Sequence, residues 1–243
     1  MKNFMNLRSI VGGIKRWILQ GYYSATKPEV IQIYGIKLRL GDHISESIKE
    51  VIYRGDYEGP ELQIVRTQLR QDDVVMEVGT GLGFLSTFCA KQIGNEKVFT
   101  YEANLELEER IKENYALNNV NPNLEICLIG ERDGEQEFYI DKDFWTSSAV
   151  RHGDDVRKIK IPMKSFDQEI QRINPTFLII DIEGGEYDLV QYANFHNVKK
   201  ILIEIHPNIL GVEKANFVKN KLKESGFQIN EKLSCVQEFF LER

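Results

Sequence analysis

The residues best suited to chemistry follow an apolar run, in the stretch FLIIDIEGGE at positions 177–186. Four consecutive apolar side chains predict a strand that is covered on both faces, as in a parallel sheet. Asp181, Glu183 and Glu186 come directly after this run, and charged groups are costly inside such a sheet. We therefore expect the acids just beyond the carboxyl end of the strand, the edge at which open α/β sheets bind ligands.

A second group of ionisable residues follows the next apolar run, ILIEIH, which ends in Glu204 and His206. Their alternation places the two on one face of a strand, and neighbouring strands bring them to the same rim as Asp181 and Glu183. If this rim transfers a group to a hydroxyl of an acceptor molecule, a base is needed to remove the proton of that hydroxyl. We predict Asp181 or His206 as the base and Glu183 as the residue that orients the acceptor. A carboxylate is a weak base unless burial raises its pKa, whereas an unshifted histidine titrates near neutrality.

The same rim allows other interpretations. Asp181, Glu183 and His206 are a candidate site for Mg²⁺ or another divalent ion that would lower the pKa of the acceptor. In contrast, His206 before Pro207 is also compatible with an ordinary strand end, and Glu186 with a first-turn acid that complements a helix dipole. The acids by themselves do not decide among these alternatives.

A glycine-rich turn precedes this region, in the sequence EVGTGLG at positions 77–83. It follows an apolar strand and leads into a helix, and Glu102 ends the next strand 19 residues after Gly83, near the spacing of a ribose-binding acid. Glu77 would repel a phosphate, and the spacing differs from the Gly-x-Gly-x-x-Gly of dinucleotide sites. S-adenosylmethionine, which carries a sulfonium, an ammonium and no phosphate, suits the turn better. The alternative is a tight turn without a ligand. The predicted cofactor contacts are Glu77, Gly79, Thr80, Gly81, Gly83, Glu102, Ala103 and Asp181.

Strands alternate with helices from position 74 onward, which indicates a doubly wound α/β fold. We expect a mostly parallel sheet of seven strands: VVMEVG, KVFTYEA, LEICLIG, FLIIDI, ILIEIH, and a closing antiparallel hairpin of FQINEK and VQEFFLER. The segment at about 135–164 interrupts the alternation and is predicted as a strand-and-loop insertion. Within it, Trp145, Ser147 and Ser148 are candidate acceptor contacts, together with Glu204; Trp145 is equally suited to anchoring the loop.

Residues 1–70 are predicted as an N-terminal extension of the domain at 71–243. Positions 1–27 carry five basic residues and no acid, with apolar residues at helical spacing. Such a helix packs on its own domain or a partner subunit, or contacts an anionic membrane. Two short strands are expected around Tyr34-Gly35, then a helix with a serine near its start, then a helix with Pro60 in its first turn.

Composition limits the class of protein. The chain of 243 residues is 42% hydrophobic, enough for one domain with a sizeable core, and its net charge of −6 gives no global attraction to nucleic acid. Cys89, Cys127 and Cys235 lack metal-ligand spacing and are predicted as buried thiols in a reducing compartment. No apolar run approaches a membrane span and no signal peptide is recognisable, so we expect a cytoplasmic protein.

Several of these motifs match a known family. EVGTGLG followed by YEAN (101–104) resembles the first two motifs of class I S-adenosylmethionine-dependent methyltransferases, and DIEGGE (181–186) resembles the hallmark of the FkbM family. The resemblance covers roughly residues 53 to 208 and includes DYEGPEL, IGERDGEQEF, SSAV and IEIHP. The common Asp-x-Gly-Ala-Asn-x-Gly of that family is altered here, because Glu77, Thr80 and Leu82 replace its Asp, Ala and Asn.

The resemblance implies a Rossmann-like fold and O-methylation, commonly of sugar hydroxyls in polysaccharides, lipopolysaccharides or glycosylated natural products. The expected partner is a sugar or glycan acceptor and not a nucleic acid, with peripheral membrane contact through residues 1–27 and a homo-oligomer both left open. Methylation of RNA or of a small non-sugar metabolite, and a non-catalytic cofactor-binding subunit, are the alternatives. Asn174-Pro-Thr-Phe177 resembles a motif of amino-methylating enzymes, but it precedes the strand rather than following it.

Overall fold

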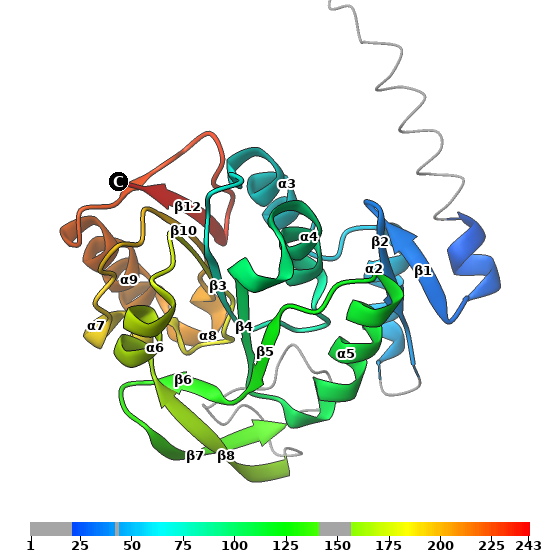
Figure 1. Cartoon of the computed structure of the whole chain (residues 1–243), viewed down its shortest axis with the longest axis horizontal. Coiled ribbons are helices and arrows are strands. Elements are labelled where there is room, and N and C mark those ends of the chain that lie inside the picture. The colour runs from blue at the N-terminus through cyan, green and yellow to red at the C-terminus, as the bar shows by residue number, and fades with distance from the viewer. Residues whose placement is uncertain (1–20, 42–43, 141–156) are drawn as a thin grey trace, which may run out of the picture.

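A seven-stranded sheet forms the centre of the computed structural model, which describes residues 21–41, 44–140 and 157–243. The strand order is β11-β12-β10-β9-β3-β4-β5 (Figure 1). Five strands are parallel: β3 (Val75–Val78), β4 (Val98–Glu102), β5 (Asn123–Ile126), β9 (Phe177–Ile180) and β10 (Lys200–Glu204). The last strand, β12 (Glu238–Glu242), runs antiparallel to β10 and to β11 (Gln228–Ile229). The predicted α/β fold, with a mostly parallel seven-stranded sheet and a C-terminal antiparallel pair, is confirmed.

Helices cover both faces of this sheet (Figure 1). One face packs against α3 (Gly59–Gln68), α4 (Phe84–Ile93) and α5 (Glu108–Leu117), and the other against α6 (Phe166–Ile173), α7 (Glu186–Tyr192) and α9 (Val212–Glu224). Successive strand residues therefore enter different cores: Val75 and Phe177 contribute to the first, Met76 and Leu178 to the second. Double coverage explains why β3 and β9 are buried at every position.

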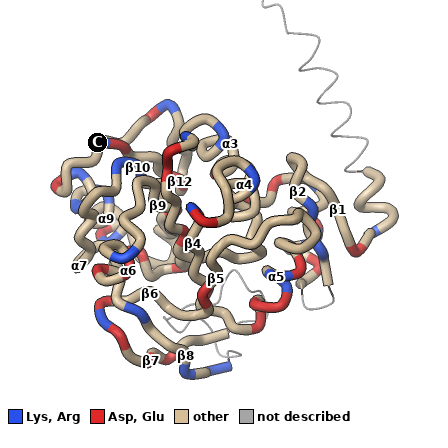
Figure 2. The backbone as a smooth tube through the Cα atoms, viewed as in Figure 1, with Lys and Arg blue, Asp and Glu red and all other residues tan. Residues whose placement is uncertain are grey.

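The segment after β5 differs from the sequence prediction. LEICLIG is not one strand, because β5 ends at Ile126 and β6 (Leu128–Gly130) joins a separate three-stranded sheet in the order β6-β8-β7. The other two strands are β7 (Gly134–Ile140) and β8 (Arg157–Ser165), which pair antiparallel. Acidic residues of β7 lie beside basic residues of β8 (Figure 2), including a 2.6 Å ion pair between Glu137 and Lys158. Strands β7 and β8 are the described part of the predicted insertion at about 135–164, whereas β6 precedes it.

Short elements complete the domain and refine the prediction. The sequence patterns do not predict α6, whose N-terminus is capped by Ser165, or the single-turn helix α8 (Pro207–Leu210). Two 3-10 turns, η1 (Asn95–Lys97) and η2 (Leu105–Leu107), precede β4 and α5. Phe177 begins β9, so Asn174-Pro-Thr lies at the amino end of that strand, as predicted.

The N-terminal part packs against the same core as α4. Residues 21–26 are helical, and β1 (Val30–Ile33) and β2 (Ile36–Arg39) form the hairpin predicted around Tyr34-Gly35. Asn114 of α5 and Asn118, which caps the C-terminus of that helix, accept hydrogen bonds from the backbone of β2, at 2.8 and 2.9 Å. Ser45 caps α2 (Glu46–Arg54), in agreement with the predicted serine near the helix start. Positions 1–20 of the predicted basic helix lie outside the described residues, among which no helix has the length and apolarity needed to cross a membrane.

Candidate active site

The glycine turn between β3 and α4 lies directly against the end of β9. Gly79 has a φ of +86°, and a Cβ atom there would be 1.6 Å from the carbonyl oxygen of Asp181. Its N–H donates to the carbonyl of Tyr101 at 2.9 Å, and the N–H of Asp181 donates to the carbonyl of Val78 at 2.9 Å. The glycine is therefore required by the packing of three neighbouring strand ends, and it brings the turn next to Asp181.

Glu77, which precedes the turn, is held within it. Its side chain is 2% exposed and accepts hydrogen bonds from the hydroxyls of Thr80 and, at 2.6 Å, of Thr100. Burial raises the pKa of Glu77 to about 7, against the opposing effect of these hydrogen bonds. The carboxyl group fixes the shape of the turn as well as lining the space beside it.

Glu102 ends β4 and points back to the same turn. Its carboxylate accepts N–H donors from Gly81 at 2.9 Å, Thr80 at 3.2 Å and Asn104 at 2.7 Å. Burial raises its pKa, although the backbone donors oppose that effect. A carboxylate has about four lone-pair positions, so three donors leave capacity for a further hydroxyl. Glu102 thus has the place and the acceptor capacity expected of a ribose-binding acid.

A cavity of about 620 Å³ connects this turn with the predicted catalytic rim. Gly79, Gly81, Glu102 and Ala103 line it together with Asp181, and further lining residues come from α3, the three-stranded sheet and β12. Its volume lies within the range of small-molecule sites. The two groups of residues predicted from separate motifs therefore share one enclosed space.

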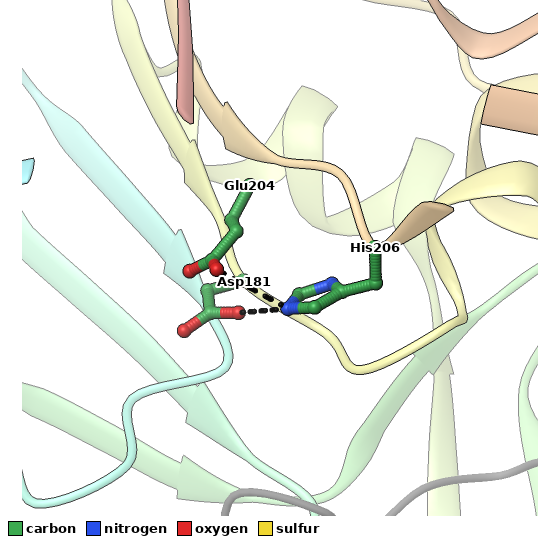
Figure 3. Close-up of side chains that lie close together, drawn as sticks. All are labelled: Asp181, Glu204 and His206. Carbon is green, nitrogen blue, oxygen red and sulfur yellow. Dashed lines mark ion pairs between the residues drawn. The ribbon is translucent and has the colours of Figure 1, made fainter. Parts of the chain in front are cut away.

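The rim residues of β9 and β10 converge on the imidazole of His206 (Figure 3). The Nε2 atom lies 3.4 Å from a carboxylate oxygen of Glu183, 3.4 Å from one of Glu204 and 3.9 Å from Oδ1 of Asp181. The prediction that neighbouring parallel strands bring these four side chains to one rim is confirmed. Glu183 and Asp181 line the cavity, whereas the side chain of His206 is 9% exposed.

Glu186 lies in the first turn of α7, as predicted, but it also has a partner that the sequence does not indicate. Its side chain is fully buried, and one carboxylate oxygen forms a hydrogen-bonded ion pair with Nδ1 of His206. The other oxygen, Oε2, is buried without a hydrogen-bond partner among the described residues. Gly184, between Glu183 and Glu186, has a left-handed φ of +83°.

The charge on His206 also differs from the sequence prediction. Burial lowers the pKa of His206, but the hydrogen bonds to Glu186 and Glu204 and the charge of Glu183 outweigh it and raise the pKa to about 11. The imidazole is therefore protonated at neutral pH, so the expectation that it titrates unshifted near neutrality does not hold. A protonated imidazole is a hydrogen-bond donor and a counter-charge, not a base.

Two carboxyl groups near His206, those of Asp181 and Glu183, also have raised pKa values, which makes them stronger bases than ordinary carboxylates. Burial and the charges of Glu204 and Glu183 raise the pKa of Asp181 well above its usual range, although His206 opposes this. Burial likewise raises the pKa of Glu183 to about 7. Oδ1 of Asp181 is buried and accepts no hydrogen bond from the described residues. Asp181 thus presents a basic carboxyl group to the cavity, with its Oδ1 paired with the imidazole of His206.

One group of three side chains at the rim could hold a metal ion, and it differs in one residue from the predicted group of Asp181, Glu183 and His206. One ligand atom from each of Asp181, Glu204 and His206 lies within 4.8 Å of the others, and Glu204 takes the place that we predicted for Glu183. Glu204 was predicted as an acceptor contact, and it lines the cavity. Trp145, Ser147 and Ser148, the remaining acceptor predictions, lie outside the described residues.

The segment DYEGPEL contributes site residues whose roles were not predicted. The hydroxyl of Tyr57 accepts the N–H of Leu82 at 3.4 Å, which ties the start of α3 to the glycine turn. Glu58 adopts the left-handed φ of +46° and lines the cavity, and burial raises its pKa well above the ordinary value. Glu61 lies one turn later and also lines the cavity. Only their proximity to the carboxyl ends of the parallel strands, where ligands bind, would have identified Tyr57, Glu58 and Glu61 as site residues.

Two cysteine predictions hold and one fails. Cys89 and Cys127 are buried, and burial raises the pKa of both thiols. Cys235 is exposed, because it lies in the loop before β12 and not in a strand. The two buried thiols are packing residues in their protonated form, as the spacing argument predicted.

Comparison with known proteins identifies the family of the domain. A family model described as the methyltransferase FkbM domain matches residues 73–229, which include the glycine turn and both rim strands. Solved structures with a similar arrangement include a precorrin-6y C5,15-methyltransferase from Geobacter metallireducens (TM-score 0.48, 12% identity, covering 76% of this chain and 89% of that one). A methyltransferase from Pyrococcus furiosus has a TM-score of 0.46 at 13% identity and covers 95% of this chain and 97% of its own. An O-methyltransferase from Bacillus cereus, solved in complex with SAH, has a TM-score of 0.40 at 12% identity, with 83% of each chain covered.

Proposed function

The chain belongs to the FkbM methyltransferase family, and we propose that it transfers the methyl group of S-adenosylmethionine to a hydroxyl oxygen, most readily one of a sugar. The observation that carries this proposal is one cavity that is lined by the cofactor-type turn, by Glu102 and by Asp181, whose side chain is 42% exposed. Methyl donor and acceptor must lie within contact distance for an in-line displacement. A shared cavity meets that requirement.

The residues around the glycine turn fit the proposed cofactor. Glu102 has acceptor capacity left for ribose hydroxyls, and Gly79 and Gly81 line the cavity without side chains that would fill it. Carboxyl groups nearby favour a ligand with sulfonium and ammonium charges over one with phosphates. When bound, the cofactor supplies an activated methyl carbon. The protein itself has to hold the acceptor and remove its proton.

We assign proton removal to Asp181 and orientation of the acceptor to Glu183. Asp181 lines the cavity, and desolvation together with the charges of Glu204 and Glu183 makes its carboxylate a better base than that of an ordinary aspartate. The acceptor oxygen would bond to the methyl carbon as the carbon–sulfur bond of the cofactor breaks and S-adenosylhomocysteine leaves, and the proton of the acceptor hydroxyl would pass to Asp181. His206, held by Glu186, keeps its positive charge beside the developing charges and acts as a positioning residue. In this mechanism a metal ion at Asp181, Glu204 and His206 is not needed.

The walls of the cavity support a polyhydroxylated acceptor. Glu58, Glu183 and Glu204 line it, and carboxylates accept hydrogen bonds from hydroxyl groups. The same charges oppose a phosphate backbone, so the cavity favours a sugar over RNA. A small non-sugar alcohol fits the same reasoning, whereas a non-catalytic subunit would have no use for a basic Asp181 in the cavity wall.

Two measurements test the proposal. First, calorimetric titration should give micromolar binding of S-adenosylmethionine and S-adenosylhomocysteine, and Glu102→Ala should weaken it. Second, production of S-adenosylhomocysteine should be measured with a panel of neutral glycans, amino sugars and nucleotide sugars. With any acceptor that the wild type uses, Asp181→Asn should lower kcat at least a hundredfold, because general-base catalysis contributes about 10²–10⁴.

The control separates chemistry from binding. Asp181→Asn should bind S-adenosylhomocysteine as the wild type does. Asp72→Asn, the same change at an exposed position away from the cavity lining, should leave turnover unchanged. Unchanged turnover in Asp181→Asn would contradict the assignment of the base. Absence of cofactor binding to the wild type would contradict the proposed function as a whole.

A further inference from the structure

Three glutamates from different elements meet in the wall of the cavity, apart from the imidazole of His206. One ligand atom from each of Glu61 of α3, Glu204 of β10 and Glu238 of β12 lies within 4.8 Å of the others. All three line the cavity. They are separated widely in the sequence, so their convergence results from the tertiary fold.

Two of these glutamates are brought together by strand pairing alone. Glu204 and Glu238 are directly opposite each other in the antiparallel pair of β10 and β12. Like charges at opposed positions destabilise a sheet. Every other pair in this register contains at least one uncharged residue or joins opposite charges, as Lys200 with Glu242. The opposed glutamates are therefore the exception within β10 and β12: Glu204 has a counter-charge in His206, at 3.4 Å, whereas Glu238 has no ion pair within the described ranges.

The third glutamate brings a buried acceptor that lacks a donor. The side chain of Glu61 is 9% exposed, and its Oε2 is buried with no hydrogen-bond partner in the described chain. Burial raises the pKa of Glu61 to about 7, and the charges of Glu204 and Glu238 add to that effect. Its position in the first turn of α3 favours one negative charge there, but it does not neutralise the other two.

The charge balance distinguishes this group from the catalytic rim. The rim group contains a basic side chain, His206, in contact with its carboxylates. Within the described ranges, no lysine or arginine forms an ion pair with Glu61 or Glu238. A buried acceptor without a donor and three converging carboxylates form the pattern of an all-oxygen cation site.

We propose that Glu61, Glu204 and Glu238 bind a hard divalent cation of the Mg²⁺, Mn²⁺ or Ca²⁺ class. Carboxylate ligands alone select these ions over softer transition metals. The ion would link α3 to the paired strands β10 and β12, and it would reduce the repulsion between the carboxylates of the opposed glutamates. It would also present open coordination positions to the cavity, where oxygen atoms of a ligand can bind. The site is separate from the proposed cofactor contacts and from the assigned base.

The test uses Mn²⁺ alone as the probe, by calorimetric titration of the full chain. We expect one ion per chain for the wild type and a dissociation constant at least tenfold larger for Glu61→Gln and for Glu238→Gln. Glu242→Gln is the matched control, since this glutamate lies on the same strand β12 but outside the group. It should bind Mn²⁺ as the wild type does.

Thermal unfolding provides a second readout that does not require activity. In a chelating buffer, Glu238→Gln should melt at or above the temperature of the wild type, because the opposed charges are removed. With Mn²⁺ added, the wild type should be stabilised and the variant should not, since only an ion bound to the folded state raises the melting temperature. The same melting curves show whether each variant folds.

Three results would overturn the proposal. The first is a wild type that shows no Mn²⁺ binding at millimolar concentration, and the second is a glutamine variant of Glu61 or Glu238 that retains wild-type affinity. The third is binding that survives Glu61→Gln and Glu238→Gln but is lost in His206→Ala, which would locate the ion at the catalytic rim. Titration with S-adenosylhomocysteine in the chelating buffer keeps the test separate, because failure of the cation site leaves cofactor binding unchanged.

Discussion

Replacement of Glu186 by glutamine should destabilise the protein more than any other single charge-neutralising change at the rim. Glu186 is fully buried and pairs with Nδ1 of His206, whose side chain is 9% exposed. A pKa raised from 6.5 to about 11 corresponds to roughly 6 kcal/mol of preference for the protonated imidazole. Three carboxylates share this effect, and Glu186 forms the most direct contact, so its part is roughly 2–3 kcal/mol.

Comparison with other buried ion pairs leads to a similar value. Removal of one partner of a buried pair costs about 3–5 kcal/mol, because the remaining charge loses its compensation. The other carboxylates near His206 reduce this cost. We therefore expect Glu186→Gln to lower the free energy of unfolding by about 3 kcal/mol at neutral pH.

The raised pKa of His206 also predicts how the stability difference between wild type and Glu186→Gln changes with pH. The folded-state pKa of His206 lies above its ordinary value, so its stabilisation is complete below pH 6.5 and is lost as the pH rises through about 11. The difference between wild type and Glu186→Gln should thus be largest at about pH 6.5 and should narrow toward pH 11. Urea unfolding at several pH values measures both quantities.

Asp188→Asn is the control, because it removes a charge from the same helix at an exposed position and should cost less than about 0.5 kcal/mol. The reasoning would be refuted by a Glu186→Gln variant that is within about 0.5 kcal/mol of the wild type at neutral pH. A difference that grows with rising pH would equally contradict the protonated state assigned to His206.

The remaining predictions concern the cofactor turn and the acceptor rim. Glu102→Ala should weaken binding of S-adenosylhomocysteine by about 1–3 kcal/mol, measured by calorimetry, while Glu106→Ala, an exposed acid of the following turn, should leave it unchanged. Gly79→Ala should lose stability and cofactor affinity, since its Cβ would overlap a backbone carbonyl oxygen, whereas Gly35→Ala, also at positive φ but with nothing within 4 Å, should cost only about 1 kcal/mol in thermal unfolding. Turnover should rise with pH through about 7 as Glu183 loses its proton, and Glu183→Gln should remove that step from the pH–rate profile.

Much of the fold is predictable from the sequence because its signals are local. Apolar runs indicate β3, β4, β9 and β10 nearly to the residue, and parallel pairing then requires their carboxyl ends to share one edge. That single geometric rule is enough to bring Asp181 and His206 to the same rim. The failure is also local: Cys127 separates two strands that belong to different sheets, and nothing in LEICLIG marks the change of partner.

The charge states of the site are not predictable from residue types. The apolar sequence neighbours of His206 give no reason to expect a shifted pKa, but that pKa is set by carboxylates that the fold brings from β9, α7 and β10. The inward position of Glu186 is hidden for a related reason, since a short stretch of acids and glycines does not reveal which acid turns inward. Burial and partners are properties of the tertiary structure, and the pKa follows from both.

The two carboxylate groups of the cavity together restrict the acceptor. Glu204 belongs to both: on one side it faces His206, and on the other it meets Glu61 and Glu238. The imidazolium offsets part of the negative charge of the first group, which favours a neutral hydroxyl beside Asp181. The second group stays negative unless a cation occupies it, and a phosphate-bearing acceptor would then be repelled. If Mn²⁺ binds as proposed, the preference should reverse with the ion: nucleotide sugars should become better acceptors or competitors in its presence, and neutral glycans should be affected less. Equal responses of both acceptor classes to the ion would show that the second group does not face the acceptor.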